Sequence, residues 1–518
     1  MADHPDPFGW HPEPELLDIR DEATSRPALE RLGEEAWTAA LDYIYGEALR
    51  RGMGEPPGAE ALRDVYFGPA GGPAPAPVDA RSAAQVIEAF SARMAPHMLN
   101  AWHPRVLSYF TPPPLVMSVV GELLAQVTQQ GVDVWHAGPV AAFVEEEVVR
   151  WLCDLVGYGQ GSFGLLASGG VMANFMGLAL ARDVRLAELR GLARPPRGAA
   201  LEDARVYVSD QGHFSVGRAL DELGFPPQTL VSVPTDERYH VLLDALEASI
   251  AADRAVGRMP FAVIGVAGTT NTGSIDDIPG IAAIAQRERL WFHVDGAYGA
   301  AARLSGRLAP LVPGLELADS VTVDPHKWFF QAYDIGGLVV RDGALLGRVF
   351  ARRPEYYRGG GETAAAHDDH SADSLDFYTL GFEGTRRWRA LKLWMSWHHL
   401  GTEGLGRLVE RTADMAAYLH GSIVGSRDLE EAHHPELGVV CFRHLPPRLA
   451  GDALDRHQDR LQAALERDGE GWLSTTRLRG ATWLRAGVMN PMTRESDIDQ
   501  LLATIRRLAA SEVRSGAM

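Results

Sequence analysis

The strongest constraint on the fold is a regular alternation of helix-like and strand-like segments that begins near Leu115. Between the strand-like runs lie segments with helical periodicity, such as the one that Pro139 begins. Alternation of this kind predicts an α/β fold with a mostly parallel sheet covered by helices on both faces. Short apolar runs rich in β-branched residues are the predicted strands: Arg205–Ser209, Phe261–Ala267, Leu290–Val294, Ser320–Val323 and Gly336–Val340.

Two further regions flank this alternation. The first residues of the chain show a helical pattern through Leu29-Glu30-Arg31-Leu32. After position 389 the chain enters another helix, and Gly438–Arg443 and Ala481–Val488 predict strands of a smaller domain. We therefore expect an N-terminal helical segment over 1–114, a large domain over 115–385 and a small C-terminal α+β domain over 386–518.

Composition excludes several classes of protein. The net charge of -19 disfavours binding to nucleic acid or to an anionic membrane surface. Cys153 and Cys441 are the only cysteines, too few for a disulfide framework or a cysteine metal site. The most apolar stretch is interrupted by Gly121 and Glu122, short of a membrane span. We expect a cytoplasmic protein with no metal, no nucleic-acid partner and no membrane partner.

A lysine stands where one apolar run ends. Val321-Thr322-Val323 is followed directly by Asp324-Pro325-His326-Lys327-Trp328. This order delivers a lysine amine to the mouth of a parallel sheet, where a desolvated amine can form a Schiff base with an aldehyde cofactor. A solvated lysine at a strand end is the alternative interpretation of Lys327 taken alone.

A second strand end adds an acid. The run Trp291-Phe292-His293-Val294 ends in Asp295, and the small residues Gly296 and Ala297 follow. A helix-capping acid is the alternative interpretation of Asp295 taken alone. However, a lysine for the imine and an acid for a pyridine nitrogen are together the minimum equipment of an enzyme that uses pyridoxal phosphate.

Three further polar segments follow predicted strands or apolar runs. Ser168-Gly169-Gly170 opens a helical run, and glycines at a helix N-terminus can hold a phosphate. His213 could stack on a flat ring or exchange a proton, and Thr270 could hydrogen-bond a phenolic oxygen. Each segment alone has an ordinary structural explanation. Their joint position matches the carboxyl edge of an open α/β sheet, where ligands bind.

These motifs together resemble the group II pyridoxal-phosphate-dependent decarboxylases. The resemblance runs from about Trp102-His103-Pro104 to Arg386 and beyond, with the motifs in the family's order. It implies the aspartate aminotransferase type I fold, pyridoxal 5'-phosphate as the cofactor, and a homodimer whose active sites take residues from both subunits. The matching segments are Ser168-Gly169-Gly170, Ser209-Asp210-Gln211 with His213, Gly268-Thr269-Thr270, His293-Val294-Asp295-Gly296-Ala297-Tyr298 and Asp324-Pro325-His326-Lys327-Trp328.

The resemblance also implies roles for the residues around the cofactor ring. Lys327 would carry the Schiff base, and Asp295 would pair with the ring nitrogen. His213 would stack on one face of the ring and Ala297 would contact the other face. Thr270 would lie near the ring hydroxyl.

The phosphate would be held by the Ser168-Gly169-Gly170 turn and by His326. Two positions depart from the family's pattern. Val171 stands where many relatives have a small hydroxyl residue, so one hydrogen bond to the phosphate must come from elsewhere. Asp324 stands where some relatives have asparagine, and a carboxylate beside a phosphate is unfavourable unless it faces away.

The product depends on a proton donor. The family's decarboxylases carry a tyrosine on a loop after the lysine, and Pro354-Glu355-Tyr356 supplies one here, with Tyr357 as a substitute. Aldehyde-forming relatives often replace that tyrosine with phenylalanine, or the stacking histidine with asparagine. Because His213 and Tyr356 are both present, the resemblance favours release of an amine. The predicted catalytic residues are Lys327, His213, Tyr356 and Asp295.

The expected partner is a small-molecule substrate, an L-amino acid. Tyr109 and Phe110, with Trp102 just before them, resemble the family's aromatic pocket wall. Asp133 lies in a stretch that resembles the one contributed by a neighbouring subunit in this family, and a carboxylate there could attract a cationic side chain or be a structural acid. We expect decarboxylation of an aromatic L-amino acid to the amine. The alternatives are a cationic substrate such as 2,4-diaminobutyrate, an aldehyde product, an aminotransferase and a non-catalytic protein that binds the cofactor.

Overall fold

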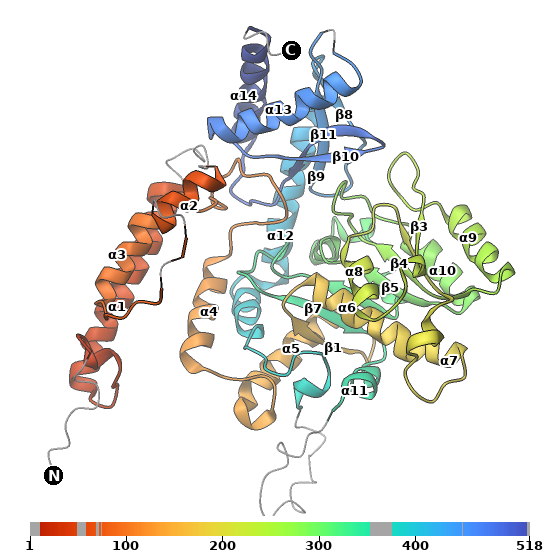
Figure 1. The fold of residues 1–518 in the computed structure, drawn as a ribbon, viewed down its shortest axis with the longest axis horizontal. Helices are drawn as coiled ribbons and strands as arrows, with labels where there is room; N and C mark the ends of the chain where they lie inside the picture. Colours follow the sequence, from red (N-terminus) through yellow and green to blue (C-terminus); the bar gives the residue numbers. More distant parts are fainter. Residues whose placement is uncertain are drawn as a thin grey trace, which may run out of the picture. The chain divides into compact units, whose positions relative to one another are not determined.

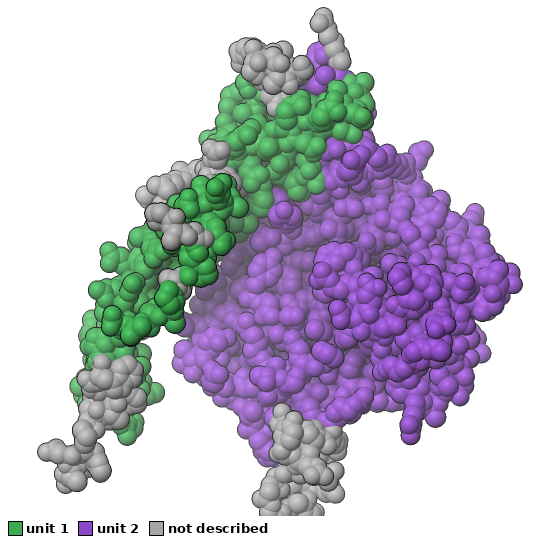
Figure 2. Space-filling view, in the orientation of Figure 1, with its two compact units in different colours: residues 1–107, 450–475, 496–518 green, residues 108–449, 476–495 purple. Residues whose placement is uncertain are grey.

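The computed structural model describes residues 11–48, 58–68, 72–73, 75–352, 375–447 and 449–514. Its contacts divide the chain into two compact units (Figure 2). Unit 1 comprises residues 1–107, 450–475 and 496–518, and unit 2 comprises residues 108–449 and 476–495. Each unit is thus assembled from separate stretches of the chain. The three-domain division expected from the sequence stays a prediction.

Unit 1 is helical. Asp21 caps its first helix by accepting a hydrogen bond from the backbone N–H of Ala23, and Ser82 and Gln85 form a capping box at the start of another helix. The helical pattern expected around Leu29 is confirmed. The helices are α1 (Glu22–Asp42), α2 (Ala59–Phe67), α3 (Ala83–Arg93), α13 (Asp452–Asp468) and, except for its first residue, α14 (Glu495–Arg514).

Unit 2 is built on a seven-stranded sheet of order β1-β7-β6-β5-β4-β2-β3 (Figure 1). The neighbours from β6 to β3 all run parallel, whereas β7 runs antiparallel to both β6 and β1. The expected α/β fold with a mostly parallel sheet is therefore confirmed. The strands are β1 (Phe163–Ala167), β2 (Ala204–Ser209), β3 (Leu230–Val233), β4 (Met259–Val266), β5 (Trp291–Asp295), β6 (Ser320–Val323) and β7 (Gly336–Val340).

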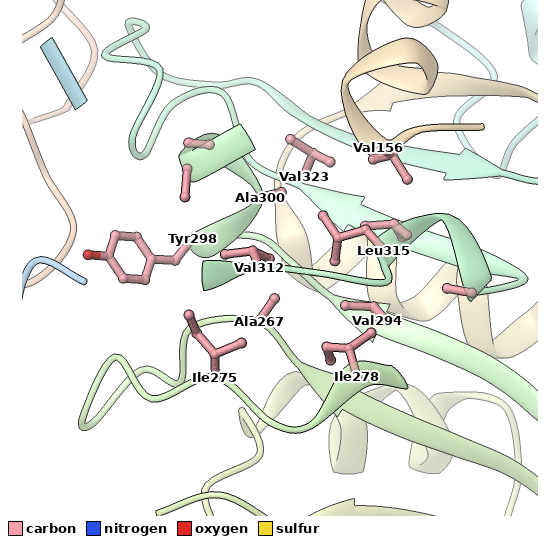
Figure 3. Packing of buried hydrophobic residues seen from close by; sticks show 14 of the residues in the cluster. Val156, Ala267, Ile275, Ile278, Val294, Tyr298, Ala300, Val312, Leu315 and Val323 are labelled. Atoms are coloured by element: carbon pink, nitrogen blue, oxygen red, sulfur yellow. The ribbon is translucent and has the colours of Figure 1, made fainter. Parts of the chain in front are cut away.

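Each face of this sheet carries its own apolar core, because successive side chains of a strand point to opposite faces. Val294 and Val323 enter the core that α5 (Pro139–Val156) and α10 (Ile278–Glu288) cover, part of which is drawn in Figure 3. The other face is covered by α6 (Gly170–Leu180) and α8 (Ser215–Glu222), which pack on Ile264, Val266, Trp291 and Leu338. Helices thus cover both faces of the sheet.

A second, four-stranded sheet has the order β10-β11-β9-β8. Its strands are β8 (Leu429–Glu431), β9 (Val439–His444), β10 (Ser474–Leu478) and β11 (Ala481–Gly487), and they confirm the smaller C-terminal α+β part. The remaining helices of unit 2 are α4 (Val116–Thr128), α7 (Ala187–Leu189), α9 (Leu243–Ala255), α11 (Ala344–Phe350) and α12 (Ala390–Val424), which bends at Gly401. Over the described ranges, no helix has both the length and the apolarity needed to cross a membrane.

A buried ion pair joins three elements of unit 2. Glu145 of α5 and Arg386, which precedes α12, are both inaccessible to solvent and form a salt bridge. Glu145 also accepts a hydrogen bond from the backbone N–H of Leu166 in β1 (3.0 Å), and Arg386 donates to the carbonyl of Val132 (3.1 Å). A buried charge is stable only when it is paired and hydrogen-bonded, so each partner depends on the other.

We expect the Glu145→Ala variant to lose about 3–5 kcal/mol of unfolding free energy, because it leaves the guanidinium of Arg386 buried without its counter-charge. Urea-induced unfolding followed by circular dichroism measures this loss. The matched control is Glu403→Ala, which removes the exposed partner of Arg407 and should leave the unfolding midpoint nearly unchanged. Equal effects of the two substitutions would contradict the structural role of the buried pair.

Candidate active site

A cavity of about 440 Å³ opens in unit 2 where β1, β2, β4, β5 and β6 end. These strand ends meet at one edge of the sheet because the strands run in the same direction. The cavity brings together every residue that the sequence predicted to contact the cofactor: Ser168, Gly169, Gly170, His213, Thr270, Asp295, Ala297, His326 and Lys327. Their placement is observed, whereas their individual roles stay predictions.

The amine of Lys327 lies at the end of β6, paired with an acid. Its Nζ is 3.2 Å from Oδ2 of Asp324, and the same oxygen is 3.6 Å from Nε2 of His326. Asp324 therefore does not face away from the cavity, as the sequence interpretation required, but turns toward the lysine. Its other oxygen, Oδ1, is buried and accepts no hydrogen bond from the described part of the chain.

Asp295 is the last residue of β5, and its carboxylate accepts hydrogen bonds on both oxygens. The backbone N–H of Ala297 donates to Oδ1 (3.2 Å), and the side-chain amide of Asn174 donates to Oδ2 (2.9 Å). Two N–H donors fix the plane of a carboxylate. A carboxylate held in this way can accept a further hydrogen bond from a protonated ring nitrogen in the cavity.

His213 follows β2 and lies on the wall of the cavity. Its Nδ1 is 2.8 Å from Oγ of Ser215 and accepts a hydrogen bond from the backbone N–H of the same residue at 3.3 Å. Burial lowers the pKa of the His213 imidazole, and the nearby carboxylate of Asp295 partly opposes this shift. The neutral imidazole is therefore favoured, and a neutral ring can stack on a flat cofactor.

The turn between β1 and α6 is suited to bind an anion. The first N–H groups of an α-helix have no intrahelical acceptor and point toward such a site, and the hydroxyl of Ser168 lines the same cavity. The turn also packs closely against its surroundings. A Cβ atom added to Gly336 at the start of β7 would lie 2.4 Å from Cα of Gly169. Glycine at position 336 therefore allows the turn to sit where it does.

A stack of aromatic rings adjoins the cavity. The ring of Phe110 stacks on Tyr298 with centroids 4.3 Å apart, and Tyr298 stacks on Trp328 at 4.8 Å; Figure 3 shows Tyr298 beside the aliphatic core. The Nζ of Lys327 lies 5.8 Å from the centroid of the Phe110 ring. Arg485 of β11 lies over the same ring (4.8 Å from Cζ to the centroid). Sequence reasoning missed Arg485, because nothing in its local pattern separates it from other strand residues.

None of the four predicted substrate-pocket residues, Trp102, Tyr109, Phe110 and Asp133, lines this cavity, although Phe110 lies beside Lys327. Asp133 does not line it, and its Oδ1 accepts a hydrogen bond from the backbone N–H of Val134 (3.0 Å). Tyr109 is 57% exposed, and Trp102 belongs to unit 1. Tyr356 and Tyr357 lie outside the described residues. The substrate-pocket and proton-donor assignments therefore stay predictions.

A buried asparagine is the site residue that sequence reasoning missed most clearly. Asn174 lies one turn into α6 and is only 1% exposed, and its amide contacts Asp295 and Ser215. The available signal was a single amide side chain in an otherwise apolar helical run, Val171-Met172-Ala173-Asn174-Phe175-Met176. A buried amide needs partners, so such a residue points to a polar site nearby.

Comparison with known proteins identifies the family that this chain resembles. The family model of the pyridoxal-dependent decarboxylase conserved domain matches residues 70–445. Aromatic-L-amino-acid decarboxylase from Bacillus atrophaeus is 34% identical over 408 residues, which is 79% of this chain and 81% of the relative. L-2,4-diaminobutyrate decarboxylase from Acinetobacter baumannii is 30% identical over 418 residues, covering 79% and 80%.

A solved structure supports the same relationship. Mouse CSAD in its apo form superposes with a TM-score of 0.83 at 26% sequence identity, covering 93% of this chain and 99% of that one. The cavity residues fit the cofactor that this family uses. An amine for the aldehyde, an acid for the ring nitrogen and a helix N-terminus for the phosphate all face one cavity.

We expect Gly336→Ala to weaken binding of pyridoxal phosphate by about tenfold or more, because the added methyl group would displace the phosphate-binding turn. Equilibrium dialysis of the purified variant measures the change. Gly337→Ala is the matched control, because the nearest atom to its added Cβ is 3.4 Å away, an ordinary contact. Unchanged affinity in Gly336→Ala would show that the turn does not hold the phosphate.

Proposed function

The chain belongs to the pyridoxal-dependent decarboxylase family, and from this premise we propose that it converts an aromatic L-amino acid into the corresponding amine and carbon dioxide. That the chain is a carboxy-lyase with pyridoxal phosphate as its cofactor follows from the family. The aromatic substrate and the amine product are our proposal. The observation that carries the proposal is the joint presence of Lys327, Asp295 and the aromatic residue Tyr298 on the wall of one cavity, with Phe110 stacked on Tyr298.

The residues of the chain prepare the cofactor for this chemistry. When bound, pyridoxal phosphate supplies a ring that accepts the electron pair left as the bond from Cα to the carboxylate breaks. Asp295 holds the ring nitrogen in its protonated state, which makes the ring a stronger acceptor. His213 orients the ring before the reaction begins. Lys327 supplies the amine that ties the cofactor to the protein.

The walls of the cavity favour an aromatic side chain. Tyr298 lines the cavity, and the ring of Phe110, which stacks on Tyr298, has its centroid 5.8 Å from Nζ of Lys327. An aromatic side chain of the substrate can pack against aromatic rings of this kind. A cationic substrate would need an acid near its side chain. Of the two carboxylates that line the cavity in the described part of this chain, Asp295 is assigned to the ring nitrogen and Asp324 is paired with Lys327. The relative with 34% identity is an aromatic-L-amino-acid decarboxylase, against 30% for the diaminobutyrate enzyme. Diaminobutyrate remains the second candidate substrate, on the strength of that relative.

A homodimer is part of the proposal. Helix α4 carries apolar side chains that are largely exposed in the single chain: Val116, Leu123, Leu124 and Val127. A contiguous exposed apolar face marks an interaction surface. A second copy of the chain could cover this face and, as in the family resemblance, contribute residues to the active site.

The proposed activity is tested by reconstituting the protein with pyridoxal phosphate and reducing it with borohydride. We expect covalent labelling of Lys327 and none in Lys327→Ala, read out by peptide mass spectrometry. Carbon dioxide, amine and hydrogen peroxide are then measured with tryptophan, tyrosine, phenylalanine, 2,4-diaminobutyrate, aspartate and glutamate. Turnover confined to diaminobutyrate or to an acidic amino acid would overturn the aromatic assignment, and absence of labelling would overturn the role of Lys327.

The proposed proton donor makes a separate prediction. We expect Tyr356→Phe to lower the yield of amine and raise that of aldehyde and peroxide. The variant lacks the hydroxyl that would donate a proton to Cα, and slower protonation would allow more reaction with molecular oxygen. Tyr357→Phe is the matched control and should leave the product ratio unchanged. If Tyr357→Phe raises the aldehyde yield and Tyr356→Phe does not, Tyr357 is the proton donor. If neither changes the ratio, the proton comes from another group.

A further inference from the structure

A line of buried polar side chains runs between the sheet and helix α6. The indole Nε1 of Trp291 donates to Oγ of Ser320 (3.0 Å), and Oγ of Ser320 is 2.8 Å from Nδ1 of His293. Nε2 of the same histidine is 3.0 Å from Oδ1 of Asn174. All four side chains are buried, so each contact replaces one that water would otherwise provide.

The direction of these hydrogen bonds follows from groups that can only donate or only accept. Trp291 can only donate, so the hydroxyl hydrogen of Ser320 is free to point at His293. Burial lowers the pKa of His293 to about 4, so the imidazole is neutral and carries one proton. Because Nε2 faces Oδ1 of Asn174, which can only accept, that proton lies on Nε2, and Nδ1 accepts from the hydroxyl of Ser320.

The amide orientation of Asn174 is fixed from both sides. Its Oδ1 accepts from Nε2 of His293 and from the hydroxyl of Thr322 (2.6 Å). Its Nδ2 faces Oδ2 of Asp295 (2.9 Å), a carboxylate oxygen that can only accept. The second hydrogen on Nδ2 points to Oγ of Ser215 (2.8 Å). The amide therefore uses both of its donors and accepts two hydrogen bonds.

The hydrogen bond from Asn174 to Ser215 determines the direction of the next one, from Ser215 to His213. Because its Oγ accepts from Asn174, its own hydrogen is donated to Nδ1 of His213 (2.8 Å). The backbone N–H of Ser215, which can only donate, contacts the same nitrogen (3.3 Å). Nδ1 of His213 is thus an acceptor, and the proton of the ring lies on Nε2.

Close packing of α6 on β5 makes the contact possible. A Cβ atom added to Gly177 would lie 2.8 Å from Cε1 of His293, so the helix backbone sits directly against the histidine. With a larger residue at position 177 the helix would have to move outward. Asn174, on the same helix, would then lose its reach to Asp295.

We propose that Asn174 is a positioning residue that holds both partners of the cofactor ring: one amide hydrogen fixes the carboxylate of Asp295, and the other, relayed by Ser215, fixes His213 in the tautomer protonated on Nε2. The significance for catalysis rests on the proposed function. The tautomer itself is a property of the protein alone and can be measured without the reaction.

The first test is ¹⁵N NMR of the full-length protein labelled only at histidine, with the His213 signals assigned by loss in His213→Gln. We expect Nδ1 of His213 to show the shift of an unprotonated acceptor in the native protein. In Asn174→Ala and Ser215→Ala, we expect that shift to move part of the way toward the average of the two tautomers, because the hydroxyl hydrogen of Ser215 is then free to turn away or is absent, while the longer backbone N–H contact (3.3 Å) remains. Ser215→Thr keeps the hydroxyl and should restore the native signal.

The second readout is the affinity for pyridoxal phosphate. We expect Asn174→Ala to raise the dissociation constant about 10- to 100-fold, because the carboxylate of Asp295 loses a donor and His213 loses its orientation. Asn490→Ala is the matched control. This residue is equally buried and its Oδ1 accepts from the backbone N–H of Met492 (2.9 Å), but it does not line the cavity. The control should lower thermal stability without changing His213 or the affinity.

Unchanged His213 signals in both Asn174→Ala and Ser215→Ala would overturn the proposal. If Asn174→Ala does not fold, Thr322→Val carries the test, since it removes a single donor to Oδ1 and should loosen the same amide. A protein that shows the expected shifts but no decarboxylation would refute the proposed function and leave this inference standing. Decarboxylation with unchanged His213 shifts in the variants would support the proposed function and overturn the positioning role of Asn174.

Discussion

The common direction of β2, β4, β5 and β6 is the constraint on which the whole site depends. In this alignment Asp295, the last residue of β5, stands opposite Val266 of β4 and Thr322 of β6. The chain then leaves each strand at the same edge and places its next residues around one cavity. Groups from distant parts of the sequence meet there without any local contact between them. The antiparallel strand β7 packs against the turn between β1 and α6, because its first residue, Gly336, lies directly against Gly169.

Beneath this edge, the sheet carries polar groups where an apolar layer would be expected. His293, Ser320 and Thr322 lie on the face that α6 covers, and all are buried. Burying such groups is costly unless every donor and acceptor is matched. The hydrogen bonds through Asn174 provide that matching, so the layer is held in one arrangement. A site that must keep a flat ring in one orientation benefits from a rigid support of this kind.

The sequence predicted the strands best where an apolar run ends in an abrupt change of residue type. Ser320–Val323 and Gly336–Val340 were predicted with the observed bounds, because Asp324 and Arg341 end the apolar runs. β1 and β3 were missed. β1 contains glycine and runs directly into the turn at Ser168, and the four-residue β3 is a short run that ends at Pro234. The residues of the site could be predicted because their chemistry lies at strand ends. The partners of Asn174 could not, since they are brought together only by the packing of α6 on β5.

The stack of Phe110, Tyr298 and Trp328 connects the surroundings of the Lys327 amine with the packing that supports this lysine. Phe110 faces the amine of Lys327, while Trp328, the neighbour of that lysine, is anchored to α12 by a hydrogen bond to Thr412 (2.8 Å). Replacing a ring of this stack to admit a different amino acid would therefore also disturb the support of Lys327. Substitutions that change the substrate, in nature or in the laboratory, should therefore cost less activity at positions that line the cavity but lie outside the stack.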